Sequence, residues 1–249
     1  EIPMNLEKMV ATLVQKVEHR FYGKYRGLVV DNVDPEQLGR LKVQVPSLLG
    51  TEVVTGWAMP CVPYGGEANQ GFFFIPDVGA GVWVEFEEGD LEFPIWTGTF
   101  WSKPGGNSEV PKPSNSDGSE QGSVQDPPTR KIIKTSKGNS IEMEDKDNEE
   151  VFIIKYSDGS KTNVVTMDKD GIVIVDANNN TITMKPEGTT IEDLNQNTIE
   201  MTATAINIFP ASQCNLGNAA VNMVNNFPAC LFSGAPHALD AKGHAKFLK

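Results

Sequence analysis

A five-residue phrase recurs three times in the second half of the chain, and this repetition limits the folds that the chain can adopt. The copies are NSIEM at 139–143, NTITM at 180–184 and NTIEM at 197–201. Each copy alternates polar and apolar residues, which is the pattern of a β-strand with one apolar face. Because a repeated strand is a structural unit, the phrase indicates strands that stack and not a reactive site.

The apolar residues of the three copies form files that need a partner. They are Ile141, Met143, Ile182, Met184, Ile199 and Met201. One file per strand cannot close a core unless the strands coil into a solenoid or meet copies from other chains. We therefore predict that residues 130–235 form an intertwined, triple-stranded β-helix in a homotrimer, with these six residues in its core and the polar file exposed to water. A single-chain β-sandwich or solenoid is the alternative.

The first half has a different pattern. Residues 24–103 contain five or six short alternating strands separated by turn signals, which predicts a small barrel or sandwich. Within the DPEQLG turn, Gly39 is expected to take positive φ. Apolar residues at helical spacing over 4–19 predict a short amphipathic helix inside an N-terminal docking segment, 1–23. Residues 104–129 are rich in Gly, Pro and Ser, and we interpret them as a linker between the halves.

The charge of the chain argues against a nucleic-acid partner. Its formal net charge is −12, which repels a phosphate backbone. The first half does carry aromatic residues, but the strand pattern predicts that most of them are buried and so unable to stack on bases. They are Phe72, Phe73, Phe74, Trp83, Trp96 and Trp101.

Two further classes of protein are disfavoured by composition. The three cysteines include no CxxC pair, so we expect no disulfide framework. No apolar run approaches the roughly 18 residues of a membrane helix. The first residues also lack the pattern of a secretory signal.

Candidate reactive groups are few. Carboxylates gather at Glu85, Glu87, Glu88, Asp90 and Glu92. Paired acids can hydrolyse glycosides, but this group lies on a strand and its turn, and we expect a solvated acidic rim. His237 could bind a metal only if three copies met on an axis, so it is a weak metal candidate. We expect no catalytic residue and no cofactor.

Several phrases of the first half carry a family resemblance. GLVVDNVDPEQLGRLKVQVPSL, GWAMP and PDVGAGVWVEFEEGDLEFPIWTG resemble the OB-fold domain of phage-tail central spike proteins and of their VgrG relatives in type VI secretion. This similarity covers about residues 24–103. Residues 130–235 resemble the triple-stranded β-helix of these spikes only in their rhythm of strands and turns.

The resemblance implies an all-β, non-enzymatic homotrimer at the centre of a contractile baseplate. In that family, an OB-fold barrel adjoins a hub and a β-helical spike pierces the target cell's outer envelope when the sheath contracts. It implies synthesis in the cytoplasm and assembly into a phage tail or injection particle. A lysozyme domain is not expected here, and the hub is expected to be a separate protein. Residues 236–249 would form a tip segment, which could hold a PAAR-like tip protein.

The alternative function is a glycan-binding or depolymerising tail fibre. Such proteins usually need long loops or an aromatic groove on the β-helix, and the second half offers only scattered aromatic residues. The sequence does not distinguish a phage tail from a secretion system or a toxin-injecting particle.

Overall fold

The computed structural model describes residues 8–10, 14 and 20–212. They form two compact units that divide after Val110. Most of the predicted helix over 4–19 lies outside the described residues, as do His237 and the tip segment 236–249. Within the described part, no helix is both long and apolar enough to cross a membrane.

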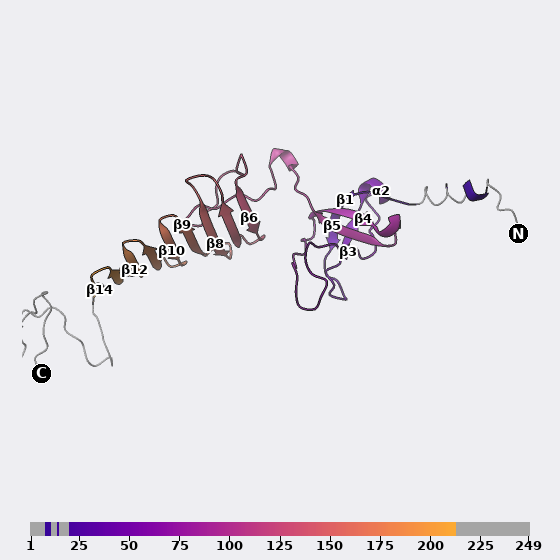
Figure 1. The fold of residues 1–249 in the computed structure, drawn as a ribbon. Coiled ribbons are helices and arrows are strands. Elements are labelled where there is room, and N and C mark those ends of the chain that lie inside the picture. Colours follow the sequence, from indigo (N-terminus) through magenta and orange to yellow (C-terminus); the bar gives the residue numbers. More distant parts are fainter. Residues whose placement is uncertain (1–7, 11–13, 15–19, 213–249) are drawn as a thin grey trace, which may run out of the picture. The chain divides into compact units, whose positions relative to one another are not determined.

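The first unit is a curled, five-stranded half-barrel of the OB type (Figure 1). Its strands are β1 (Tyr25–Asp31), β2 (Lys42–Gln44), β3 (Met59–Pro60), β4 (Gly81–Phe86) and β5 (Pro94–Thr99). They lie in the order β2-β1-β4-β5-β3, and only the β3–β5 pair is parallel. Short helices lie between them at α2 (Pro46–Leu49) and η1 (Glu87–Gly89), and η2 (Pro104–Gly106) follows β5. The alternation that predicted strands also fills the core, since Val82, Val84 and Phe86 of β4 are all buried.

One carboxylate organises the turn between β1 and β2. Asp34 Oδ2 accepts hydrogen bonds from Leu38 N at 2.8 Å and Arg40 N at 3.2 Å, and Oδ1 accepts from Arg40 Nη2 at 2.7 Å. The guanidinium of Arg40 holds the pKa of Asp34 well below its usual range. Gly39 has a φ of 75°, as the sequence predicted, and its carbonyl accepts a bond from the buried indole of Trp96 at 3.1 Å. The DPEQLGR phrase is therefore a self-bonded turn fixed to the core.

We expect Asp34→Ala to lower the midpoint of thermal unfolding of the first unit by several degrees, because it removes the acceptor of these bonds. Glu36→Ala is the matched control. Glu36 also pairs with Arg40, at 3.1 Å, but its side chain is exposed, and exposed ion pairs contribute little. All four tryptophans lie in the first unit, so tryptophan fluorescence follows this unit alone. Equal midpoints for the two variants would contradict the assigned role of Asp34.

The second unit is one antiparallel sheet of nine strands in chain order (Figure 1). The strands are β6 (Arg130–Lys134), β7 (Ser140–Glu144), β8 (Val151–Ser157), β9 (Thr162–Asp168), β10 (Gly171–Val175), β11 (Thr181–Lys185), β12 (Gly188–Glu192), β13 (Thr198–Thr202) and β14 (Ile206–Phe209). Each strand pairs with the one before it across a short turn.

The segment interpreted as a linker contains the boundary between the units and part of the second unit. Residues 111–126, called the strap below, form a turn in which Asn115 N donates to Ser119 O and Gln121 N donates to Pro113 O. Pro113 and Ser114 of the strap are fully buried. Ser114 is bonded to Arg130 of β6, Glu142 of β7 and Lys155 of β8.

Candidate functional site

A continuous file of branched apolar residues crosses every strand of the second unit. Residues paired across neighbouring strands point to the same face of a sheet. The pairing register links one Ile or Val from each strand: Ile133, Ile141, Ile154, Val165, Ile174, Ile182, Ile191, Ile199 and Ile208. This file and its neighbour on the same side are called the apolar face below.

The neighbouring file contains most of the long apolar residues. It runs through Lys131, Met143, Phe152, Met167, Ile172, Met184, Thr189, Met201 and Ile206. The six residues predicted for a trimer core therefore all lie on the apolar face, in two adjacent files. In the single chain this face is open, with Ile141 and Met143 each 40% exposed and Ile206 71% exposed. A contiguous open apolar surface of this kind marks an interaction site.

The sequence predicted six of the eighteen residues in these two files of nine. NVVTM at 163–167 is a fourth copy of the repeated phrase, 17 residues before NTITM, and we did not predict it. Three Ile residues that lie outside the phrases were also missed: Ile174, Ile191 and Ile208. They recur at the same 17-residue interval, and this period was the signal that could have found them.

Each phrase begins with Asn and varies in the later positions, and the Asn side chain makes the same hydrogen bond in every copy. The side-chain Oδ1 of Asn163 accepts a hydrogen bond from Ala177 N at 2.7 Å, that of Asn180 from Leu194 N at 3.0 Å, and that of Asn197 from Ala211 N at 2.8 Å. Asn139 makes the equivalent bond with Ser157 N at 2.9 Å. Each Asn thus ties the start of its strand to the backbone at or just past the end of the next strand.

At the other end of the strands, two glycines allow neighbouring strands to approach closely. Gly171 and Gly188 begin β10 and β12 with φ of 142° and 153°. A Cβ on Gly188 would lie 2.2 Å from Met201 O, and one on Gly171 would lie 2.0 Å from Met184 O. No side chain fits at that distance, so only glycine lets the strands pair here.

We expect Gly188→Ala to destabilise the β12–β13 pair by roughly 2 kcal/mol, since it combines a strained φ with a backbone clash. Gly159→Ala is the matched control, because Gly159 also has positive φ, 92°, but no atom lies within 4 Å of its Cβ position. Amide hydrogen exchange across β12 and β13 measures the difference. Equal loss of protection in the two variants would show that the clash with Met201 O is relieved at no cost.

The opposite face of β6–β9 carries a buried network of charges under the strap. Ser114 N donates to Glu142 Oε2 at 2.8 Å. Arg130 lies 3.2 Å from Glu142 and 3.3 Å from Glu144, and all three side chains are buried. The prediction that this polar file is exposed is therefore wrong for β7, because a segment with few large apolar residues covers it.

Hydrogen bonding keeps both carboxylates of this network charged. Burial alone would raise the pKa of Glu144, but bonds from its neighbours, among them Gln125 Nε2 and Arg130 Nε, lower it to about 2. Burial likewise opposes the lowering of the pKa of Glu142, which bonds from Ser114, Ser140 and Arg130 outweigh. The strap is thus attached to the sheet by charged hydrogen bonds, which are the stronger class.

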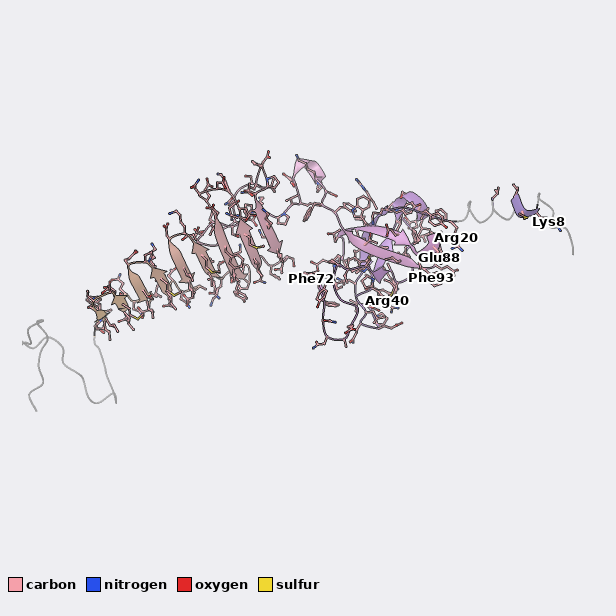
Figure 2. All side chains as sticks on the ribbon, viewed as in Figure 1. Lys8, Arg20, Arg40, Phe72, Glu88 and Phe93 are labelled. Atoms are coloured by element: carbon pink, nitrogen blue, oxygen red, sulfur yellow. The ribbon has the colours of Figure 1, made fainter. Side chains whose placement is uncertain are left out.

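A second open apolar surface lies on the first unit. The loop over residues 61–80 joins β3 and β4 and contains Phe72–Phe74, of which Phe73 is 76% exposed. Phe72 is labelled in Figure 2. The Tyr64 and Phe72 rings lie 5.9 Å apart, and they line a hollow of about 1250 Å³ together with Leu38 and Phe73. We call this surface the aromatic loop.

Burial of the aromatic residues was predicted correctly only in part. Trp96 is buried and Trp83 is half-buried, but Phe72–Phe74 and Trp101 are exposed. The prediction is wrong for these four because residues 61–80 form no strand and Trp101 lies beyond the end of β5. The aromatic loop contains two carboxylates and no Lys or Arg. It therefore lacks the cations of a platform that binds single-stranded nucleic acid.

The acidic rim is partly paired with basic residues. Lys24 Nζ lies 2.7 Å from Glu85, and Arg20 lies 3.0 Å from Asp90 and donates to Glu88 O, with Arg20 and Glu88 labelled in Figure 2. Among residues 8–10, 14 and 20–212, no three His, Cys, Asp or Glu side chains gather as a metal site would require. His237, the weak metal candidate, is outside these residues.

Comparison with protein families identifies the first unit. Residues 25–101 match the model of the type VI secretion system/phage-baseplate injector OB domain. They are an injector OB domain. Comparison with curated proteins gave no match to the chain.

The boundaries of the injector OB domain agree with the five-stranded unit. The match begins at the first residue of β1 and ends two residues after β5, so it contains the Asp34 turn, the aromatic loop and the acidic rim. It confirms the resemblance noted in GLVVDNVDPEQLGRLKVQVPSL and the phrases after it. An injector OB domain indicates a component of a phage baseplate or type VI secretion injector.

Proposed function

We propose that the chain is the central spike of a contractile injection machine and that three copies form it. The observation that carries the proposal is the file of nine branched apolar residues, one from each strand of the sheet, which is open to solvent in one chain. Three such faces meeting around a threefold axis would bury these files together. The injector OB domain supplies the context, since it indicates a baseplate component.

The sheet also has the mechanical properties that a spike needs. Its strands are joined by short turns, and Asn163, Asn180 and Asn197 each bond the start of a strand to the backbone just past the end of the next one. Bonds of this kind oppose bending between neighbouring hairpins. Assembly of three sheets would add inter-chain packing along their length, and the spike would pierce the target's outer envelope on sheath contraction.

The proposed partners occupy the two ends of the chain. A separate hub protein of the baseplate is proposed at the injector OB domain, where the aromatic loop offers open apolar side chains. A PAAR-like tip protein is proposed at the C-terminal end. The work of such a spike is mechanical, so the proposal assigns it no catalytic residue and no cofactor.

The mass of the native protein tests the proposal directly. Sedimentation or light scattering should give about 81 kDa, three times the chain mass of 27.1 kDa, and this mass should persist in mild SDS without boiling. A mass of 27.1 kDa under native conditions would mean that the apolar face is not a trimer core. A trimer that also binds a surface glycan on an array would favour the tail-fibre alternative over the spike.

A further inference from the structure

The strap and the sheet enclose a polar pocket on the face opposite to the apolar face. Its volume is about 390 Å³. Its lining includes Glu120 of the strap and, from the sheet and its turns, Lys134, Lys137, Lys155, Ser157 and Thr162. Its wall therefore comes from two segments that are distant in sequence, and it is called the lysine pocket below.

One lysine of this pocket is buried. Lys155 is only 7% exposed, and its ammonium donates to Ser114 Oγ at 2.8 Å and to Gly118 O at 3.2 Å. An ammonium group has three N–H donors. These two bonds leave one donor of Lys155 for a ligand in the pocket that this side chain lines.

The charge of the lysine pocket is opposite to that of the chain. Lys134, Lys137 and Lys155 line it against one carboxylate, Glu120, in a protein whose net charge is −12. Glu120 is paired with Lys134 and lies 3.9 Å from Lys112.

The surroundings of Lys155 disfavour its charged form, and an anionic ligand would offset this effect. Its burial and the charge of Lys134 lower the pKa of Lys155, while Glu142 and Glu120 act in the opposite direction. Glu142 is already paired with Arg130. An additional negative charge in the pocket would therefore stabilise the buried ammonium.

We propose that the lysine pocket binds a phosphate group. Ammonium groups and hydroxyls are the donors that phosphate accepts from, and the pocket offers hydroxyls from the sheet, among them Ser157 and Thr162. The volume admits a phosphate together with part of a molecule that carries it. Because the pocket lies within one chain, the proposal does not depend on trimer formation.

Titration of the full chain with inorganic phosphate tests the proposal. Calorimetry at constant ionic strength, with chloride as the reference anion, should show saturable binding of one phosphate per chain. Lys155→Met should weaken it about tenfold or more, which corresponds to one charged hydrogen bond. Lys137→Gln, on an exposed turn, should also weaken it and does not endanger folding. Lys169→Gln, on a distant turn, is the control and should leave it unchanged.

The source of the phosphate is distinguished by vesicles that contain phosphatidic acid. Capture of the protein by these vesicles, reversed by free phosphate and lost in Lys137→Gln, would identify a membrane phosphate monoester. Saturable binding of free phosphate without vesicle capture would identify a soluble ligand. Either result supports the site. Absence of saturable phosphate binding, or equal binding by wild type, Lys155→Met and Lys137→Gln, would overturn it.

Discussion

Ile182→Asp should abolish the native trimer and leave a chain of 27.1 kDa in sedimentation. Ile182 lies in the middle of the nine-residue file, paired with Ile174 on one side and Ile191 on the other. In a threefold assembly, three new carboxylates would meet near one axis without partners. An unpaired buried carboxylate costs several kcal/mol, so three of them destabilise the trimer by more than the loss of one apolar contact would. Ile199→Asp should have the same effect.

Thr183→Asp is the matched control for this prediction. It introduces the same charge on the next residue of β11, but on the opposite face of the sheet, where its cross-strand neighbours are Val173 and Thr190. We expect this variant to sediment like the wild type. Trimers of normal stability in both Ile182→Asp and Ile199→Asp would refute the assignment of the apolar face to a threefold core. Loss of the trimer in Thr183→Asp as well would show that the sheet tolerates no new charge on either face.

The apolar face was predictable because it depends on a local rule. Alternation assigns residues to faces, and repetition of the same phrase shows that the faces continue from strand to strand. Ile182 and Ile199 could be placed in this way before any register was known. Alternation alone does not place their neighbour Ile191, because its strand, GTTIE, is interrupted by threonines, and only the 17-residue period links Ile191 to Ile174 and Ile208.

The strap was not predictable because its burial depends on polar partners. Its composition is that of a linker, and Gly118 and Pro113 give no periodic signal. The SIEME strand also gives no sign that its polar residues are buried. Alternation assigns residues to the two faces of a strand, but it does not show which face another segment covers. The match between the two segments is visible only in the folded chain, where Ser114 N donates to Glu142 and Arg130 donates to Ser114 O. Charged groups at this depth are rare unless they are paired.

The buried charges lead to the second large effect. Arg130→Gln should destabilise the second unit by about 3 kcal/mol, because it leaves Glu142 and Glu144 buried without their cation. Lys131→Gln is the matched control on the next residue. Lys131 also pairs with a carboxylate, Asp145, but both side chains are exposed, and such pairs are worth less than about 1 kcal/mol. Amide exchange of the strap, above all of Ser114, should rise in Arg130→Gln and not in Lys131→Gln.

Removing the carboxylates should restore much of what Arg130→Gln loses. The triple variant Arg130→Gln, Glu142→Gln, Glu144→Gln removes both carboxylates that Arg130→Gln leaves without their cation, so it should be more stable than Arg130→Gln alone. A triple variant less stable than the single one would mean that the carboxylates act through hydrogen bonds to the strap and not through their pairing with Arg130.

Lowering the pH should weaken the attachment of the strap to the sheet. In the folded chain the pKa of Glu144 lies near 2 and that of Glu142 is also lowered, both from an ordinary value of 4.5. A carboxyl group whose folded pKa is depressed adds stability above its unfolded pKa and loses it as the pH falls through the folded value. Protection of Ser114 N in the wild type should therefore be constant above about pH 5 and decline toward about pH 2. In the triple variant the decline should be smaller, because the two groups that take up the protons are absent.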